Sequence, residues 1–221
     1  MRKAVYGVFG TGGCARGIMP LARAQLGAQS VELDAVRFID DNAGASPTVN
    51  GHSVLSFEQF CALEAEDHYV AIAIANSRVR EQIYERIIAA GIKPLSIRAQ
   101  QTVIMDDVQI GVGALLSPFV TLTSNITIGI QFHANLYSYV EHDCRIGDFV
   151  TFAPGVKCNG NIVIEDHAYI GSGAVIRQGT MDRPMIIGRG AVVGMGAVVT
   201  KDVAPGATVV GNPARPLVQE A

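Results

Sequence analysis

The sequence contains no tryptophan, and aromatic residues make up only 6% of its 221 positions. Charged residues are few as well, at 17%, and they leave a formal net charge of −3 with no dense run of Lys and Arg. Nucleic acid is therefore not expected as a partner, because clustered cations supply most of the affinity for phosphate backbones. Glycine, by contrast, occurs 24 times, which suits narrow β-coils with tight corners.

Long apolar runs are missing too. The apolar stretch near the N-terminus is broken by Gly7, Gly10, Gly12 and Gly13, so we expect neither a signal peptide nor a membrane-spanning helix. The four cysteines are scattered along the chain, and we expect free thiols in a cytoplasmic protein.

The second half of the sequence repeats with a period of six. Side chains of a strand alternate between its two faces, so this period keeps one side chain of each short strand inside. Three such units complete a triangular coil of eighteen residues, as in a β-solenoid. The position four residues further on is also mostly small or apolar and gives a second interior side chain. The sixth-position residues are Ile104, Ile110, Leu116, Leu122, Ile128, Ala134, Val140, Ile146, Phe152, Cys158, Ile164, Ile170 and Ile176; the second set includes Ala114, Val120, Ser138, Cys144, Val150, Val156, Ala168 and Ala174.

The period breaks once. Ile176 is followed by the next repeat residue, Ile187, after eleven positions, which predicts a loop that leaves the coil across residues 180–185. The period then resumes at Val193 and Val199. We assign residues 101–221 to this repeat domain.

Residues 1–100 lack the period, and their alternating segments predict a small Rossmann-like α/β domain with a parallel sheet. Strands are predicted at 5–9, 31–39 and 70–75, with a last strand within 92–99. Helices are predicted at 14–26, 56–63 and 77–90.

A glycine-rich loop follows the first strand and contains Gly10, Gly12 and Gly13, with Arg16 in the helix beyond. Backbone N–H groups and a helix N-terminus make such a loop an anion site. Asp40 and Asp41 end the second strand, and Asn76 ends the third, ahead of Arg78 and Arg80. All three loops are expected at one sheet edge. The domain is short for a dinucleotide fold, so a mononucleotide-sized ligand is favoured over NAD.

The segment around His142 carries most of the chemistry in the repeat. Val140 and Cys144 point inward by the period, which leaves His142 at an outward corner. A step of eighteen puts Ser124, His142, Gly160 and Gln178 in one column. A carboxylate from Asp143 or Glu141 could hold the imidazole in one tautomer as a general base.

Two other chemistries are disfavoured by the same period. Cys144 and Cys158 point inward, away from solvent and from a base, so neither is expected to act as a nucleophile. His133 and His167 stand nine and twenty-five residues from His142, which places the three histidines in different columns. We therefore expect no metal site, and we expect His133 and His167 at surface corners.

The repeat resembles that of the hexapeptide-repeat acyltransferases, whose fold is a left-handed parallel β-helix, and the terminal Gly211-Asn212-Pro213-Ala214-Arg215 adds to the likeness. The glycine loop, the paired Asp40 and Asp41, and Asn76 resemble the N-terminal domain of bacterial nucleotide-sugar N-acetyltransferases and sialic acid O-acetyltransferase-like proteins. Many of these carry a histidine where this sequence has Cys14.

The resemblance implies roles for several residues. His142 would be the base, with Asp143, Ile146, Gly147 and Asp148 completing the matched stretch. Asn135 would lie beside the acceptor sugar, and the Gly160 N–H near the thioester oxygen. Thr151 stands where a second histidine sometimes occurs. The family associates as homotrimers with acetyl-CoA between adjacent subunits, along which the resemblance places Gly171, Ser172, Gly194, Gly196 and, at a phosphate, Lys201.

The expected function is acetyl-CoA-dependent N-acetylation of a nucleotide-linked 4-amino-4,6-dideoxyhexose for surface polysaccharide or glycan, by direct transfer. An O-acetyltransferase for sialic acid or a related sugar is one alternative. A non-catalytic nucleotide-binding β-helix module is another.

Overall fold

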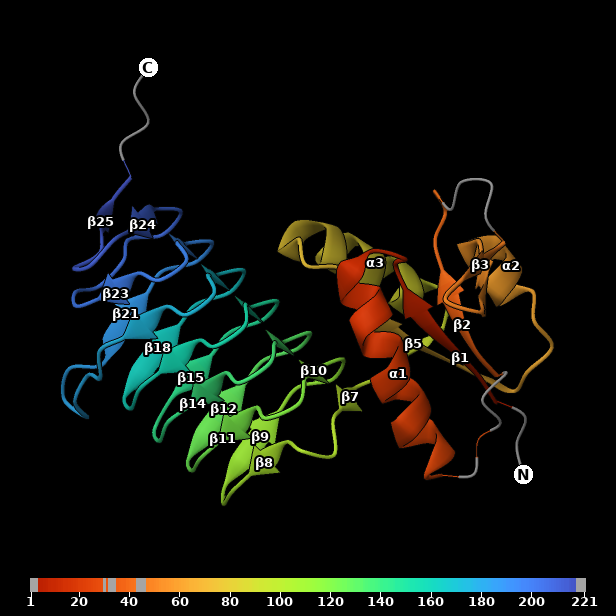
Figure 1. The fold of residues 1–221 in the computed structure, drawn as a ribbon, viewed down its shortest axis with the longest axis horizontal. Helices are drawn as coiled ribbons and strands as arrows, with labels where there is room; N and C mark the ends of the chain where they lie inside the picture. The colour runs from red at the N-terminus through yellow and green to blue at the C-terminus, as the bar shows by residue number, and fades with distance from the viewer. Residues whose placement is uncertain (1–3, 30, 32–34, 43–46, 218–221) are drawn as a thin grey trace. The chain divides into compact units, whose positions relative to one another are not determined.

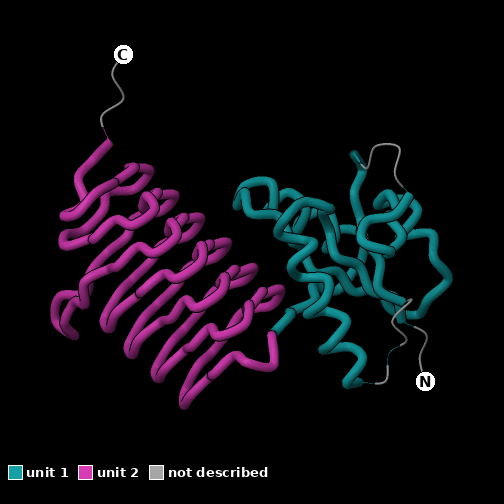
Figure 2. Tube along the Cα trace, viewed as in Figure 1, with its two compact units in different colours: residues 1–98 teal, residues 99–221 magenta. Residues whose placement is uncertain are grey.

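The computed structural model describes residues 4–29, 31, 35–42 and 47–217, and the chain divides into two compact units, residues 1–98 and 99–221 (Figure 2). The boundary expected from the sequence, after residue 100, lies two positions further along. Among the described residues, no helix is long and apolar enough to cross a membrane.

The first unit is built on a sheet in the order β3-β4-β2-β1-β5-β6, parallel except for the β3–β4 pair (Figure 1). The central strand β1 is apolar, and its Val8 is completely buried. The elements of the unit are β1 (Ala4–Phe9), α1 (Gly13–Gly27), β2 (Val36–Ile39), β3 (Thr48–Val49), β4 (His52–Leu55), α2 (Phe57–Cys61), β5 (Asp67–Ile72), α3 (Ser77–Ala89), β6 (Lys93–Pro94) and β7 (Ile97–Arg98).

Polar side chains start two of the helices. Ser56 and Gln59 form a capping box at α2, and the Asn76 side chain accepts hydrogen bonds from the first backbone N–H groups of α3. These caps fix where the loops after β4 and β5 end.

The helices and strands lie near their predicted ranges, with several differences. The last strand, predicted within 92–99, is two short strands, β6 and β7. The hairpin of β3 and β4 was not predicted, because its strands are short and none of their residues is fully buried. The strand predicted at 31–39 is described from Val36 onward, and residues 32–34 lie outside the described residues. The strand predicted at 70–75 is β5, which ends at Ile72 and leaves residues 73–76 as a loop.

The second unit is a parallel β-helix with three faces. Its strands are β8 (Val103–Ile104), β9 (Val108–Ile110), β10 (Leu115–Leu116), β11 (Thr121–Leu122), β12 (Ile126–Ile128), β13 (His133–Ala134), β14 (Tyr139–Val140), β15 (Arg145–Ile146), β16 (Thr151–Phe152), β17 (Lys157–Cys158), β18 (Ile162–Ile164), β19 (Tyr169–Ile170), β20 (Val175–Ile176), β21 (Met185–Ile187), β22 (Val192–Val193), β23 (Val198–Val199), β24 (Thr208–Val210) and β25 (Arg215–Pro216). The first face is β8-β11-β14-β17-β20-β23, the second is β9-β12-β15-β18-β21, and the third includes β10, β13, β16, β19, β22, β24 and β25 in that order.

The coil length expected from the sequence is confirmed by strand register. On the first face, Leu122 pairs with Val140, which pairs with Cys158, which pairs with Ile176, each eighteen positions on. The sixth-position residues from Leu116 to Ile176 are all buried in one continuous core. The second interior set is buried too, and all of it except Ala114 and Ser138 belongs to the same core. Ile104 and Ile110, on the first coil, are partly buried.

The interruption of the repeat is a loop, as predicted. Strand β20 ends at Ile176 and β21 begins at Met185, and Ile164 pairs with Ile187, twenty-three positions on in place of eighteen. The extra residues form a loop outside the coil, and the pairing of interior residues continues on the next coil, where Ile176 pairs with Val199.

Two histidines differ from expectation. His133 and His167 were expected at surface corners, but they are only 3% and 7% exposed. His133 lies on the third face between the buried Leu115 and Thr151 of neighbouring coils. The His167 ring stacks on Phe149 with 5.2 Å between ring centroids. Outward orientation along the period therefore does not guarantee exposure.

The inward–outward alternation can be tested with neighbouring residues of β18. Ile164 is 1% exposed in the core, whereas Val163 points outward and is half-buried. We expect Ile164→Ala to lower the free energy of unfolding by about 2–5 kcal/mol, because it leaves a cavity. Val163→Ala, which removes side-chain carbons from the outer surface of the same strand, should cost clearly less. Urea unfolding followed by circular dichroism measures both, and equal losses would contradict the assigned interior.

Candidate active site at a corner of the β-helix

His142 lies where the chain turns from the first face to the second. We call this edge the His142 corner; it comprises residues 123–125, 141–143, 159–161, 177–184 and 200–202. Successive coils are joined there by backbone hydrogen bonds from Asp143 N to Ser124 O, Asn161 N to His142 O, and Gly179 N to Gly160 O, at 3.0–3.1 Å. The corner therefore stacks Ser124, His142 and Gly160 in the column that the repeat predicts.

The carboxylate partner of His142 is Asp143. Its Oδ2 lies 2.7 Å from His142 Nδ1, and its Oδ1 accepts a hydrogen bond of 3.1 Å from Asn125 Nδ2 on the preceding coil. Among the described residues, Glu141 makes no hydrogen bond with His142. Of the two candidate acids, Asp143 is therefore the one that orients the imidazole. A carboxylate at Nδ1 holds the proton there and leaves Nε2 free to accept one.

Local backbone conformation gives Asp143 this position. Asp143 has φ 58°, and Asn125 and Asn161 in the same column have φ 57° and 56°. Short Asn and Asp side chains tolerate this left-handed region better than other non-glycine residues. The His142 hydrogen bond, followed by that of Asn125, lowers the pKa of the Asp143 carboxyl below its ordinary value. Sequence reasoning missed Asn125, although its step of eighteen from Asp143 was a readable signal.

Gly160 provides the surface on which the His142 ring rests. A Cβ on Gly160 would lie 2.6 Å from His142 Cε1 and 2.7 Å from Nε2, so only glycine fits beneath the ring. No hydrogen-bond acceptor for the Gly160 N–H is found in the part of the chain that the structure describes. A basic nitrogen and an unused backbone donor are thus adjacent at this corner.

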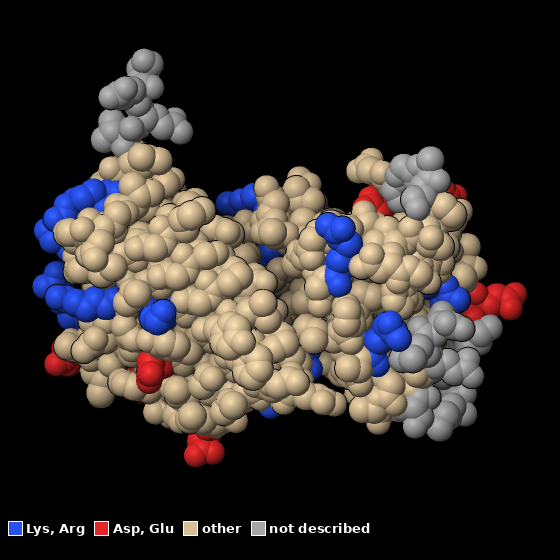
Figure 3. Space-filling model, in the orientation of Figure 1, with Lys and Arg blue, Asp and Glu red and all other residues tan. Residues whose placement is uncertain are grey.

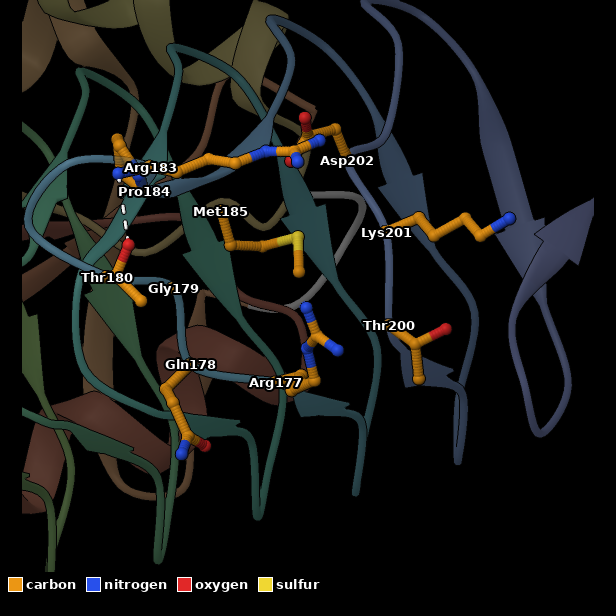
Figure 4. A pocket seen from close by; sticks show the side chains of 10 residues that line it. All are labelled: Arg177, Gln178, Gly179, Thr180, Arg183, Pro184, Met185, Thr200, Lys201 and Asp202. Atoms are coloured by element: carbon orange, nitrogen blue, oxygen red, sulfur yellow. Dashed lines mark hydrogen bonds between the residues drawn. The ribbon is translucent and has the colours of Figure 1, made fainter.

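A basic pocket of about 620 Å³ lies on the same corner, on the coils after Gly160 (Figure 4). The cations Arg177, Arg183 and Lys201 line it. Figure 4 shows Arg177 and Arg183 on opposite sides of Met185, with Lys201 extending away from it. Asp202 also lines it, but its carboxylate accepts a hydrogen bond from Ile186 N at 3.0 Å. Figure 3 shows Lys and Arg gathered over the last coils of the second unit. The pocket suits a phosphorylated ligand.

Five predicted residues lie at a different edge. We call the turn from the third face to the first the Ser172 corner; it comprises residues 117–120, 135–138, 153–156, 171–174 and 194–197. Gly196 N donates to Ser172 O at 2.8 Å, and the Asn135 side chain donates to Phe152 O at 3.1 Å. The two corners are at opposite ends of the first-face strands. One chain therefore does not bring these five residues together with His142: Asn135, Gly171, Ser172, Gly194 and Gly196.

The first unit gathers its predicted residues where β1, β2 and β5 end. Gly10 has φ 104°, and Gly12 and Gly13 begin α1 with open space beside their Cα atoms. Asp40 accepts hydrogen bonds from the Thr11 hydroxyl and from Asn42 N. Thr11 was not predicted; its place inside the glycine loop, opposite an aspartate, was the available signal.

Asp41 and Asn76 hold neighbouring helices. Asp41 accepts a hydrogen bond of 2.8 Å from Phe57 N at the start of α2, and it pairs with Arg86. Burial alone would raise the pKa of this carboxyl, but the hydrogen bonds from Arg86 and Phe57 outweigh it and lower the pKa. Asn76 Oδ1 accepts hydrogen bonds from Arg78 N and Val79 N as the cap of α3.

Arg80 requires a correction. It was expected to face a ligand, but its side chain is completely buried and donates to Ile74 O at 2.8 Å and Ala75 O at 3.1 Å. Burial lowers its pKa to about 10. Arg80 thus supports the loop after β5 from within, whereas Arg16 is exposed on α1. The helix period places both residues near the loop but does not indicate which one is covered.

The cysteines remain free thiols in the structure. Cys144 and Cys158 are buried at 1% and 0% exposure, as the period predicts. Within the described residues, no group of three His, Cys, Asp or Glu side chains is placed to hold a metal ion.

Comparisons with known proteins match both units. The family described as the PglD N-terminal domain matches residues 7–87, and the hexapeptide repeat of succinyl-transferase matches residues 161–201. The chain is 51% identical to the GDP-perosamine N-acetyltransferase of Escherichia coli O157:H7 over 96% of each protein. Two solved structures are similar along nearly the whole chain. WeeI from Acinetobacter baumannii AYE has 56% identity and a TM-score of 0.94, over 97% of this chain and 100% of that one. The acetyltransferase domain of PglB from Neisseria gonorrhoeae FA1090, in complex with acetyl coenzyme A, has 30% identity and a TM-score of 0.85, over 98% and 100%.

The pairing of Asp143 with His142 predicts a titration. The pKa of the Asp143 carboxyl should lie below its ordinary value, because hydrogen bonds from His142 and Asn125 favour the charged form. It should rise toward that value in His142→Ala and rise less in Asn125→Ala. NMR titration of the labelled carboxyl carbon measures all three proteins. An unchanged pKa in His142→Ala would show that the pair does not form in solution.

Proposed function

The chain belongs to the sugar N-acetyltransferases of the left-handed β-helix family, and on this premise we propose that its acceptor is a GDP-linked 4-amino-4,6-dideoxyhexose such as GDP-perosamine. Enzymes of this family use acetyl-CoA as the acyl donor. The choice of GDP rests on the 51% identity to a GDP-perosamine N-acetyltransferase along both units. The mechanism rests on one observation: the oriented His142 imidazole lies directly against Gly160.

The reaction is a direct transfer. His142 Nε2 removes a proton from the sugar amine as the nitrogen attacks the thioester carbonyl carbon. The new C–N bond produces a tetrahedral oxyanion, which the Gly160 N–H stabilises. Collapse breaks the C–S bond, and the imidazolium returns its proton to the leaving thiolate. Cys144 and Cys158 are buried in the core, so neither thiol is placed to form a covalent acyl-enzyme.

The donor binds along the His142 corner. Arg177, Arg183 and Lys201 supply positive charge for the phosphates of acetyl-CoA in the basic pocket. Gly171, Ser172, Gly194 and Gly196 belong to the Ser172 corner and reach the donor from a neighbouring subunit of a homotrimer. This assembly is supported by the distribution of the site residues over two corners of one chain.

The nucleotide binds to the first unit. The N–H groups of Gly12 and Gly13, with the N-terminus of α1, face the diphosphate, and Arg16 adds an exposed cation. Gly10 shapes the turn, since its own N–H donates to Ile39 O at 2.7 Å. Asp40, held by Thr11, contacts the ribose or the base. Asn135, at the Ser172 corner of a neighbouring subunit, lies beside the acceptor sugar. GDP-sugars and acetyl-CoA are both cytoplasmic metabolites, so the cytoplasm is the proposed location.

A donor–acceptor assay tests the function. The purified protein should release CoA thiol from acetyl-CoA when given GDP-perosamine, and more slowly with UDP-linked or dTDP-linked 4-amino sugars. His142→Asn should lower kcat by about 10²–10⁴-fold, because general-base catalysis contributes that much. Binding of CoA should be retained.

Gln109→Asn is the matched control, since it shortens an exposed side chain on the second face at the first coil. It should keep wild-type turnover. Near-normal kcat in His142→Asn would refute the base, and a preference for UDP-linked or dTDP-linked sugars would refute the acceptor.

A further inference from the structure

The direction of the Gly160 N–H depends on the peptide bond between Asn159 and Gly160. A trans peptide is planar, and its C=O and N–H groups point in opposite directions. Whatever holds the carbonyl of Asn159 therefore also sets the direction of the Gly160 donor. Although this peptide lies at an exposed corner, hydrogen bonds hold both its carbonyl and the side chain of Asn159.

The carbonyl of Asn159 points into the β-helix. It accepts a hydrogen bond from Cys144 Sγ at 3.2 Å, and Cys144 is 1% exposed. The other buried thiol, Cys158 Sγ, lies 3.9 Å from the same oxygen. With its carbonyl directed at Cys144 in the interior, the peptide directs the Gly160 N–H outward. Outward from Gly160 lies the His142 ring, 2.6–3.1 Å from where a Cβ would stand.

The side chain of Asn159 is held on both neighbouring coils. Its Oδ1 accepts a hydrogen bond of 2.9 Å from the Tyr139 hydroxyl, and its Nδ2 donates to Ile176 O at 2.7 Å. Rotation of the peptide would have to break these contacts or the thiol contact. Of the groups that hold Asn159, the two buried thiols bond the carbonyl of the catalytic peptide itself, and Cys144 Sγ, at 3.2 Å against 3.9 Å for Cys158 Sγ, is the closer donor.

The hydrogen bond between Cys158 and Cys144 indicates which acceptor each thiol proton takes. The hydrogen bond between the two thiols, together with burial, raises the pKa of Cys158 well above its ordinary value, and the same bond lowers the pKa of Cys144, so Cys158 is the donor of the pair. Each thiol carries one proton, so that of Cys144 is left for the Asn159 carbonyl. His142 O, at 3.5 Å from Cys144 Sγ, is the more distant acceptor.

We propose that Cys144 is a positioning residue for acetyl transfer: its thiol holds the Asn159 carbonyl inward and thereby aims the Gly160 N–H at the thioester oxygen. The inference rests on the proposed role of Gly160 as the oxyanion donor. The thiol forms no covalent bond with substrate, and it is too deeply buried to touch acetyl-CoA. Cys144 follows the proposed base by two residues, and its side chain points into the core behind the site, where it does not contact the substrates.

Three variants separate positioning from packing. Cys144→Ala removes the donor and should lower kcat about tenfold, a part of the effect of losing an oxyanion donor, with KM for both substrates within about twofold of wild type. Cys144→Ser keeps a donor of similar size and should restore most of the turnover. Cys158→Ala removes a buried thiol of the same size, whose sulfur is further from the carbonyl, and should stay within about twofold in kcat.

A spectroscopic measurement isolates the donor from the acceptor sugar. The infrared band of the thioester carbonyl, measured with carbonyl-labelled acetyl-CoA bound to the enzyme alone, should lie at lower frequency than in free acetyl-CoA, because the Gly160 N–H polarises it. The band should move back toward the free frequency in Cys144→Ala, but not in Cys144→Ser or Cys158→Ala.

The outcomes separate this inference from the proposed function. Equal losses of kcat in Cys144→Ala and Cys158→Ala, or an unchanged band in Cys144→Ala, would overturn the positioning role. A wild-type band at the free frequency, or no bound thioester, would overturn both the Gly160 donor and the inference. If the band follows the predicted pattern while GDP-perosamine is not acetylated, the acceptor is wrong and the role of Cys144 stands.

Discussion

The parallel hydrogen-bond ladder of the β-helix, which repeats every eighteen residues, is the constraint on which the rest of the structure depends. It pairs Val140 with Cys158 and, one position further along, joins Glu141 to the same coil through its N–H to Cys158 O. Because the ladder continues into the corner, the His142 ring packs against Gly160. The contact between the proposed base and the proposed oxyanion donor is therefore a consequence of backbone register, and it needs no flexible loop to assemble it.

The same ladder sorts side chains into interior and exterior. Cys144 and Cys158 lie in the core, two positions from the chemistry on either coil, and one of them reaches the carbonyl behind the proposed oxyanion donor. His142 lies outside and is oriented by Asp143, which is itself held by Asn125 one coil earlier. The base and the donor are thus each supported by a residue that does not touch substrate.

Much of this arrangement was predictable from the sequence, because a period of six determines which side chains point inward and which residues share a column. The core, the register, the loop after Ile176 and the place of His142 followed from it. Exposure did not, since the period gives direction but not what covers an outer face, and so His133 and His167 were misplaced. The choice of Asp143 over Glu141 depended on a left-handed corner conformation, and the burial of Arg80 depended on carbonyls that its helix covers. Neither can be read from residue spacing.

The central claim is that the His142 corner of one chain and the Ser172 corner of another form one site. Mixed oligomers of two variants test it most directly: His142→Ala, which lacks the base, and Ser172→Trp, which fills the opposite corner. Each variant alone should be nearly inactive. In a one-to-one mixture assembled by co-expression, about a quarter of the sites combine two intact corners, so about a quarter of wild-type activity should return. Activity no higher than that of the separate variants would contradict the shared site, as would full activity of Ser172→Trp alone.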